Sequence, residues 1–231
     1  MKTLGIIGGI APGSTEDYYR LLIASYQEQA KDGSYPSILI NSIDLKRMLD
    51  MVIGNRLTEL TEYLLQEVGR LARAGADFGL MASNTPHIVF EELSHESPIP
   101  LLSIVETASE AAHRSGLRKV GLLGTRFTME GHFYPEVFAR RGISVHSPRP
   151  GDQEYIHDRY MRELIPGEFR PETREAFVAI IQRLGQDGAE GVVLAGTELP
   201  LLLRDAIGCE IPLLDTTRIH VNRAVTELLS K

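Results

Sequence analysis

The chain has 231 residues, of which 43% are hydrophobic and 24% are charged, and its formal net charge is -7. This composition is typical of globular proteins, and the length suits one large domain or two small ones. No basic run indicates nucleic acid or an anionic membrane as a partner, and no apolar stretch approaches the roughly 18 residues that cross a bilayer. The single cysteine, Cys209, excludes an internal disulfide and a thiolate-rich metal site. It favours a reducing compartment, so we expect a cytoplasmic protein.

The N-terminal segment MKTLGIIGGIAPG combines a lysine with an apolar run, as signal peptides do. Here the run is short, is interrupted by Gly8 and Gly9, and is followed by Pro12. These features favour a first strand at residues 4–7 that leads into a helix. Ser14 and Thr15 are good N-cap residues for that helix, which we expect to end near residue 32.

Strand and helix patterns alternate along the rest of the chain. After the first helix we expect strands at 38–43, 78–82 and 100–104, with an amphipathic helix at 56–74. The second half continues with strands at 119–123, 143–145 and 191–194, helices at 131–141, 153–164 and 171–186, and a closing helix after Thr217. This alternation predicts an α/β protein with parallel sheets and helices on both faces. Ligands of such sheets bind beyond the carboxyl ends of the strands.

The second half of the chain repeats the first. GADFGLMASNT from Gly75 matches GAEGVVLAGTE from Gly188, which pairs Ser83 with Gly196. KTLGIIGG is echoed by RKVGLLGT, and SPIPLLSI is echoed by EIPLLDT, in the same order. Three such echoes indicate a duplicated α/β unit. We therefore expect two pseudo-symmetric lobes with an active-site cleft between them, one built from residues 1–97 and 212–231 and the other from 98–211.

The stretch LMASNTPH, residues 80–87, places three hydrogen-bonding side chains where a predicted buried strand ends. Asn, Thr, Ser and Pro are also turn residues, so the stretch alone favours a plain turn. Its place at the carboxyl end of a strand, and its counterpart around Gly196, favour half of a ligand site instead. A pseudo-twofold site presents equivalent groups to opposite faces of a small ligand. Such a site can take a proton from one face of a carbon and return it to the other.

Five motifs occur in order along the chain, namely GIIGGIAPGST, SNTPH, GT with a second threonine at Thr128, ELIPGEF and GTELP. On these motifs the chain resembles the cofactor-independent aspartate/glutamate racemase family over nearly its whole length. The resemblance implies two pseudo-symmetric α/β domains, with the C-terminal helix returning to the first. It also implies racemisation or isomerisation of small acidic amino acids without pyridoxal phosphate or any other cofactor, and a homodimer.

Two positions depart from the family pattern. The resemblance implies catalytic cysteines before the Asn-Thr and Thr-Glu pairs, and this chain has Ser83 and Gly196 there. A thiol has a pKa near 8.5 and is readily tuned into a base, whereas a serine hydroxyl needs a neighbouring base and glycine has no side chain. Cys209 matches neither position. Ile165 also replaces the family's frequent lysine, although Arg162 and Arg170 flank it.

The candidate groups fall into three sets. The resemblance and the position at a helix start imply substrate or anion binding by Gly9, Pro12, Ser14, Thr15, Arg47, Asn84, Thr85, Thr125, Thr128 and Thr197. The alternatives for these residues are turns, caps and, for Lys46 and Arg47, a solvated basic pair. The positions with a possible role in proton transfer are Ser83, Gly196, His87, Glu198 and His220. Asp215 and Thr216 are further candidates to line the site. No cluster of residues has the spacing of metal ligands, so we expect no metal site. Gly8-Gly9 does not match the dinucleotide fingerprint G-x-G-x-x-G, so we expect no nucleotide cofactor.

Three functions remain open from the sequence. The first is an isomerase of this family that acts on an acidic amino acid or related carboxylate with altered or weakened proton transfer, by one-base exchange or a Ser83–His87 pair. The second is a different carboxylate-processing enzyme on the same scaffold. The related arylmalonate decarboxylases replace one cysteine by glycine, but this chain lacks the remaining thiol too, and Ser83 as an acyl nucleophile needs a nearby His. The third is a non-catalytic protein that binds a carboxylate or an amino acid.

Overall fold

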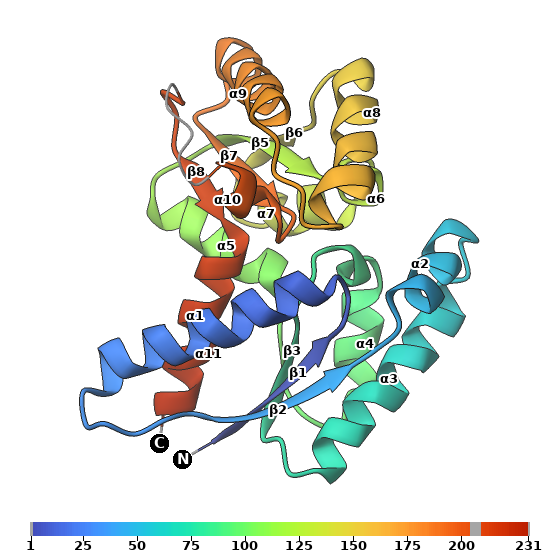
Figure 1. Ribbon diagram of the computed structural model, residues 1–231, viewed down its shortest axis with the longest axis vertical. Coiled ribbons are helices and arrows are strands. Elements are labelled where there is room, and N and C mark those ends of the chain that lie inside the picture. Colours follow the sequence, from blue (N-terminus) through green and yellow to red (C-terminus); the bar gives the residue numbers. More distant parts are fainter. Residues whose placement is uncertain (1, 204–208, 231) are drawn as a thin grey trace. The chain divides into compact units, whose positions relative to one another are not determined.

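The computed structural model describes residues 2–203 and 209–230. These form two compact units, one built from Met1–Ile104 with His220–Lys231 and the other from Val105–Ile219. Each unit holds a four-stranded sheet in which every neighbouring pair of strands is parallel (Figure 1). The predicted α/β class is confirmed.

The first sheet has the order β2 (Ser37–Ser42), β1 (Thr3–Gly8), β3 (Phe78–Met81) and β4 (Leu101–Leu102). Helices α1 (Pro12–Ala30) and α11 (Thr216–Leu229) pack on one face of this sheet, where Leu4 and Ile6 join their buried side chains. Helix α3 (Leu57–Arg73) contacts the sheet at Gly5, where an added Cβ would lie only 3.1 Å from Leu71 Cβ. Because both faces of β1 are covered, its residues form an unbroken apolar run. The remaining helices of this unit are α2 (Leu45–Ile53), η1 (Thr85–Val89) and α4 (Phe90–Glu96).

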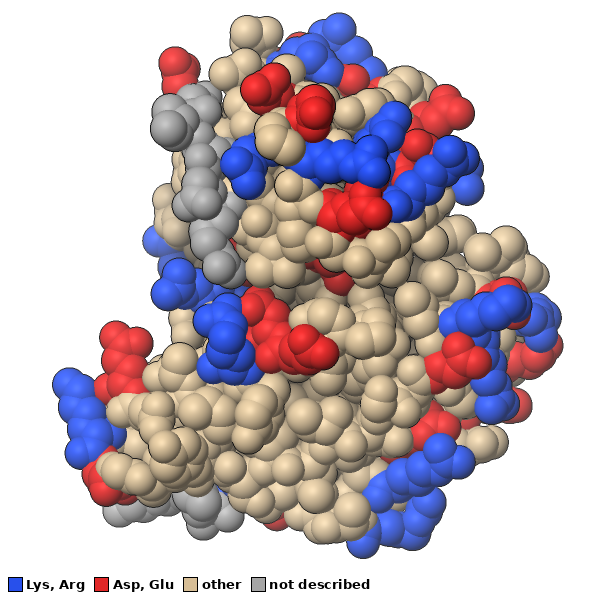
Figure 2. All heavy atoms as spheres, viewed as in Figure 1, with Lys and Arg blue, Asp and Glu red and all other residues tan. Residues whose placement is uncertain are grey.

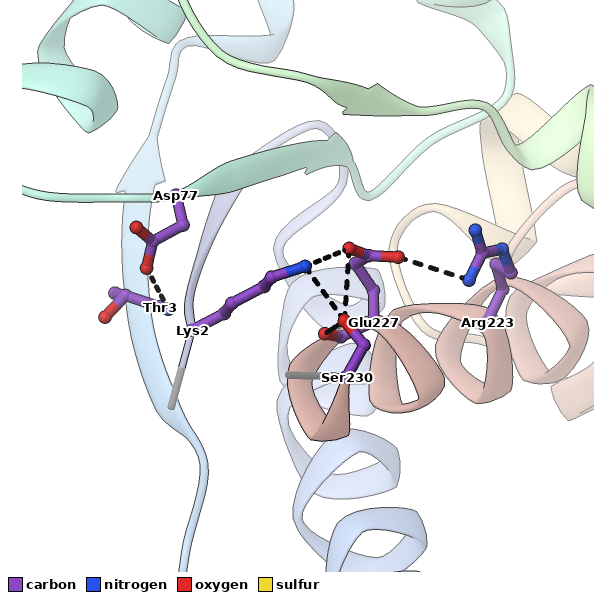
Figure 3. Close-up of polar contacts among 6 residues, drawn as sticks. All are labelled: Lys2, Thr3, Asp77, Arg223, Glu227 and Ser230. Atoms are coloured by element: carbon purple, nitrogen blue, oxygen red, sulfur yellow. Dashed lines mark hydrogen bonds and ion pairs between the residues drawn. The ribbon is translucent and has the colours of Figure 1, made fainter.

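The two ends of the described chain are held together in the first unit. The Lys2 ammonium lies 2.5 Å from Oε1 of Glu227 and 2.8 Å from Oγ of Ser230, and Arg223 lies 3.4 Å from the other oxygen of Glu227 (Figure 3). These pairs fasten the last turns of α11 beside the start of β1. They agree with the expectation that the C-terminal helix returns to the first lobe.

The second sheet has the order β6 (Ser144–His146), β5 (Lys119–Gly124), β7 (Gly191–Ala195) and β8 (Leu213–Asp215). Its core joins Leu123, Val192 and Leu194 with side chains of α8 (Pro150–Arg159), η2 (Tyr160–Leu164) and α9 (Pro171–Gln186). Segment η2 is a turn of π-helix. The remaining helices are α5 (Ile104–Arg114), α6 (Arg126–Met129), α7 (Phe133–Ala139) and α10 (Leu199–Leu203).

The two sheets repeat one another in register. In the first, Ile7 is paired with Met81, and in the second Leu123 is paired with Leu194, which are the residues that the sequence repeat makes equivalent. Ser83 and Gly196 therefore each stand two residues beyond an equivalent strand position. The pairing predicted from the sequence repeat holds in the strand registers.

The repeat extends to the corner before each of these strands. Gly75 and Gly188 both have positive φ, 98° and 92°, where glycine avoids the steric cost of a Cβ. The acidic residue two positions later accepts a backbone hydrogen bond at the start of the neighbouring strand. Asp77 Oδ2 accepts from Thr3 N at 2.7 Å, and Glu190 Oε2 accepts from Arg118 N at 2.5 Å. The Gly-Ala-acid motif thus has the same structural task in both units.

The boundaries between the units differ from the expected positions at 97/98 and 211/212. Strand β4 pairs with β3, so residues 98–104 stay with the first sheet. Strand β8 pairs with β7, so residues 212–219 stay with the second. Each of these edge strands is separated from its neighbour in the sheet by a long connecting segment. The sequence alone therefore could not assign either strand to a sheet.

Several predicted helices also differ in detail. Ser14 and Thr15 are not N-caps, because α1 begins at Pro12, a residue preset for the first helical turn. The predicted helix at 131–141 is shorter, since α7 covers only Phe133–Ala139, and the short helix α6 before it was not predicted. Helix α2 had no counterpart in the prediction, although Asp44 caps it by accepting from Lys46 N at 2.8 Å.

Acidic and basic side chains are interspersed on the face drawn in Figure 2. Short-range ion pairs in the structure include Arg170 with Glu168 at 2.5 Å. Within residues 2–203 and 209–230, no helix combines the length and the apolar character needed to cross a membrane.

Candidate functional site

The loop between β1 and α1 is a tight, strained turn. Gly9 has φ of +77°, and a Cβ added there would overlap the carbonyl oxygen of Ile43. Ala11 also has positive φ, 66°, which is uncommon for a residue with a side chain. Such strain tends to occur at functional sites. Gly9 N donates a hydrogen bond to Thr15 Oγ1 at 2.9 Å, so Thr15 braces this loop.

The predicted binding residues of this loop have different exposures. Pro12 is exposed, Thr15 is half-buried, and Ser14 is buried at 1% exposure. The Ser14 backbone N–H is already used, since it donates to Ala11 O at 3.1 Å. The loop nevertheless lies at the carboxyl end of β1, where an α/β sheet is expected to bind its ligand.

The segment that follows β3 both turns the chain and starts a helix. Asn84 precedes the short helix η1, and its carbonyl accepts from His87 N at 3.0 Å. Ser83, Asn84 and Thr85 are all buried, with exposures of 8%, 3% and 6%. β3 is the direct neighbour of β1, so this polar group and the Gly9–Thr15 loop lie at the ends of adjacent strands.

Both candidate histidines of the first unit have structural contacts. His87 Nε2 accepts a hydrogen bond from Ile104 N at 3.2 Å, at the first residue of α5. Burial, together with the proximity of His220, lowers the pKa of His87 to about 3. His220 contacts Tyr18 and the carbonyl of Leu102, and burial lowers its pKa to about 4. Both imidazoles are therefore neutral near pH 7, and neither is presented as an exposed proton carrier.

Arg47 lies on α2, where its guanidinium stacks over the ring of Tyr63 at 4.3 Å from the ring centre. It borders a hollow of about 460 Å³ between α2 and α3. The charged residues that line this hollow are the acids Asp44, Asp50, Glu59 and Glu62 and the bases Lys46, Arg47 and Arg56. A carboxylate ligand would meet more acidic than basic groups there, which does not favour the hollow as a carboxylate site.

In the second unit, Thr125 and Thr128 follow β5. Their hydroxyl oxygens lie 3.2 Å apart, and both side chains are buried. Thr128 also packs on Gly124, since its Cβ lies 3.0 Å from the place that a Cβ on the glycine would take. Thr15 packs in the same way on Gly8 in the first unit. Each of these threonines thus supports the end of the central strand as well as standing near the predicted site.

The segment Gly196-Thr197-Glu198 follows β7, the direct neighbour of β5. Thr197 Oγ1 donates to Glu198 Oε2 at 3.0 Å, and both residues are only 4% exposed. The phenol of Tyr160 donates a short hydrogen bond to the same carboxylate oxygen. A Cβ added at Gly196 would lie 2.6 Å from Cε2 of Tyr160 and 2.7 Å from its hydroxyl oxygen. The tyrosine therefore fills the space beside position 196.

Tyr160 is the site neighbour that the sequence did not reveal. It begins the π-helical segment η2, and π-helical turns occur often at functional sites. Two contacts of Glu163 hold this segment, since its carboxylate accepts from Thr173 Oγ1 at 2.5 Å and from Arg159 at 2.6 Å. These contacts, the threonine first, lower the pKa of Glu163. A glycine in place of a family cysteine was the only signal in the sequence, and it does not identify which side chain occupies the space.

The other groups in the predicted set have partners in their own unit. Arg162 pairs with Asp158 at 2.8 Å, and Arg170 pairs with Glu168. Thr216 Oγ1 donates to Leu194 O at 2.7 Å, which ties the end of β8 to β7. Asp215 Oδ1 accepts from Arg218 N at 2.9 Å at the start of α11. The half-buried Cys209 packs against the core of the second unit, and burial raises its thiol pKa.

Comparison with known proteins adds the family context. A family profile described as Asp/Glu/Hydantoin racemase matches residues 7–224. The broad specificity amino-acid racemase RacX of Bacillus subtilis (strain 168) is 27% identical over 238 aligned residues, covering 98% of each chain.

Solved structures also match the whole chain. The crystal structure of an aspartate racemase homologue from Pyrococcus horikoshii OT3 is 34% identical, covers 100% of both chains and superposes with a TM-score of 0.83. A Yersinia pestis structure, described provisionally as an Asp/Glu racemase, is 30% identical with the same full coverage and a TM-score of 0.90.

Proposed function

Because the chain belongs to the Asp/Glu/Hydantoin racemase family, we propose that it is a cofactor-independent isomerase of a small acidic amino acid or a related carboxylate. The observation that carries this proposal is the matched pair of strand ends. Ser83 with Asn84 and Thr85, and Gly196 with Thr197 and Glu198, occupy equivalent places in the two sheets. Buried amide and hydroxyl donors at such places suit a carboxylate.

The proton-transfer chemistry differs from that of a two-thiol racemase. Serine at position 83 and glycine at position 196 supply no thiolate, and Cys209 stands at neither position. His87 is buried, neutral and already bonded to Ile104 N, which makes a Ser83–His87 pair a poor base. We therefore expect slower racemisation of aspartate and glutamate than a thiol-based enzyme achieves, while carboxylate binding persists.

The test is incubation with each candidate amino acid in deuterated water. Incorporation of deuterium at Cα, followed by mass spectrometry, reports proton abstraction directly, and chiral chromatography reports inversion. The panel begins with both enantiomers of aspartate and glutamate. It extends to neutral and basic amino acids, because the Bacillus subtilis relative is described as having broad specificity. Absence of α-deuteration across the whole panel would refute the isomerase proposal.

A non-catalytic protein that binds a carboxylate is the second candidate, and the missing thiols favour it. Binding needs only donors in place, whereas racemisation needs groups that move protons. Thermal stabilisation by aspartate, glutamate or a dicarboxylate such as malate, without any α-deuteration, would support this alternative.

We also propose a homodimer in a reducing compartment such as the cytoplasm. The dimer follows from the family resemblance, and the compartment fits a chain whose single cysteine cannot form an internal disulfide.

A further inference from the structure

Position 196 is closed to a side chain by its surroundings and not by its backbone. Gly196 does not have the positive φ that requires glycine, unlike Gly188 in the same unit. Three atoms of the Tyr160 phenol ring and hydroxyl lie within 2.9 Å of the place that a Cβ at position 196 would take, closer than real Cβ atoms come to their neighbours. The tyrosine therefore occupies the space that the Cβ of a cysteine at position 196 would need.

The tyrosine also brings a polar function to that volume. Its hydroxyl donates to Glu198 Oε2, which accepts a second hydrogen bond from Thr197 Oγ1. Tyr160 and Glu198 are each only 4% exposed. Burial, followed by the charge of Glu198, raises the pKa of Tyr160 well above its usual value, so the phenol keeps its proton and acts as the donor. Donation of that proton to a substrate would leave a phenolate buried beside a carboxylate, which is costly.

We propose that Glu198 is the proton-exchanging group of the second unit and that Tyr160 is its positioning residue, replacing the thiol absent from position 196. The inference rests on the proposed isomerase function. The Glu198 carboxylate takes the α-proton of the substrate, so an O–H bond forms and the electrons of the broken C–H bond remain on the substrate as an enolate. In the return step the O–H bond breaks and the C–H bond re-forms. The hydroxyls of Tyr160 and Thr197 hold the carboxylate in place before the first step and after the second.

The first arm of the test separates a positioning role from packing. Tyr160→Phe keeps the ring that fills the space and removes only the hydroxyl. We expect kcat for α-deuteration to fall about tenfold with KM nearly unchanged, because the carboxylate loses the donor that orients it, and misplacing a catalytic group by about 1 Å can cost up to about 100-fold. The acid limb of the rate–pH profile should move to higher pH, because the charged carboxylate loses a donor. Tyr155→Phe, which removes a phenol from α8 in the same unit, is the matched control and should leave both unchanged.

The second arm tests Glu198 itself. Glu198→Gln keeps the size of the side chain but cannot exchange a proton, and should lower the deuteration rate by about 100-fold or more. Glu198→Asp retains a carboxylate and should retain part of the rate. Circular dichroism and thermal melting show whether each variant is folded. An equal rate loss in folded Gln and Asp variants would count against proton exchange.

The third arm tests, without any activity assay, whether the Tyr160 side chain leaves no room for a side chain at position 196. Gly196→Ala should lower the melting temperature by at least about 2–4 °C, because the added methyl group meets the Tyr160 ring. In a Tyr160→Ala background the same substitution should lower the melting temperature clearly less. An equal drop in melting temperature in both backgrounds would show that Tyr160 does not close position 196.

The outcomes distinguish this inference from the proposed function. If the wild type fails to deuterate any amino acid of the panel, the isomerase proposal fails and the Tyr160–Glu198 pairing carries no catalytic role. If the wild type deuterates a substrate but folded Tyr160→Phe shows the wild-type kcat and pH profile, the isomerase proposal stands and the positioning role is overturned.

Discussion

The Tyr18 hydroxyl lies 2.9 Å from Nδ1 of His220, and their two rings meet edge to face. The other ring nitrogen, Nε2, lies 3.1 Å from the carbonyl oxygen of Leu102, which can only accept. Nε2 therefore carries the proton, and Nδ1 accepts from the tyrosine. This single tautomer satisfies both nitrogens of a fully buried imidazole and joins α1, β4 and α11 in the first unit.

The buried histidines predict a loss of stability in mild acid. In the folded state the pKa values of His87 and His220 are lowered to about 3 and about 4 from the ordinary histidine value of 6.5. Below pH 6.5 the unfolded chain takes up protons that the folded chain does not. The free energy of unfolding should therefore be flat above pH 6.5 and fall by about 1.4 kcal/mol per pH unit for each histidine as the pH drops towards 4.

Urea unfolding at pH 7.5 and pH 5.5 measures this dependence. His220→Gln should weaken it, because glutamine does not titrate, even if the variant is less stable at both pH values. His113→Gln, which changes an exposed histidine on α5, should leave the wild-type dependence in place. An unchanged pH slope in folded His220→Gln would contradict the assignment.

The loop after β1 predicts a specific cost for a side chain at position 9. Gly9 and Gly33 have nearly the same φ, +77° and +79°, but a Cβ added at Gly9 overlaps Ile43 O, while none of the described atoms lies within 4 Å of one added at Gly33. Both Gly→Ala variants have the backbone cost of positive φ, about 1 kcal/mol. Only Gly9→Ala has the clash as well, so it should be destabilised by at least a further 1 kcal/mol or so in chemical denaturation. Similar costs for the two variants would show that the loop can relax.

Restoring a thiol to the first unit should increase proton exchange. Ser83→Cys introduces a group whose pKa can be tuned near neutrality at the position where the family resemblance implies a cysteine. We expect α-deuteration of a bound amino acid to rise at least tenfold over the wild type, measured at saturating substrate. Ser83→Ala is the control and should show no such rise. A wild-type enzyme that already racemises aspartate at about 1–1000 per second would refute the view that the missing cysteines weaken the chemistry.

The proposed homodimer predicts twice the mass of the chain in light scattering coupled to size exclusion. The measurement should be made at micromolar concentration and repeated after tenfold dilution. A constant mass of one chain at both concentrations would exclude the dimer.

Sequence patterns could predict the architecture because its main features are local or repeated. Alternating apolar strands and amphipathic helices gave the α/β class, and the echo around Gly75 and Gly188 predicted the matched registers seen in both sheets. The N-cap of α1 is Ala11, three to four residues before the predicted caps, since Pro12 at the first turn outweighed the capping preference of Ser14 and Thr15. Strand β4 lies within the strand predicted at 100–104, whereas the three-residue strand β8 was not predicted.

The site was less accessible to sequence reasoning because its contacts join distant residues. Tyr160 lies 38 positions before Glu198, and only the folded second unit brings its hydroxyl to that carboxylate. The sequence gives no reason against restoring both family thiols, but the structure shows that Gly196→Cys meets Tyr160. The hydrogen bond from Ile104 to His87 is likewise a tertiary contact, and no local pattern distinguishes such an imidazole from a proton carrier.

The ion pair between Lys2 and Glu227 has a consequence for protein engineering. Because it brings residues 2 and 230 close together, a short flexible linker could join these two positions without disturbing the first sheet. New termini opened at the start of α5 would then give a circular permutant. In that chain the first unit runs without interruption from His220 in α11 through the linker and residues 2–104, and the second unit is likewise continuous. Each unit could then be expressed alone, which would allow its folding to be measured separately.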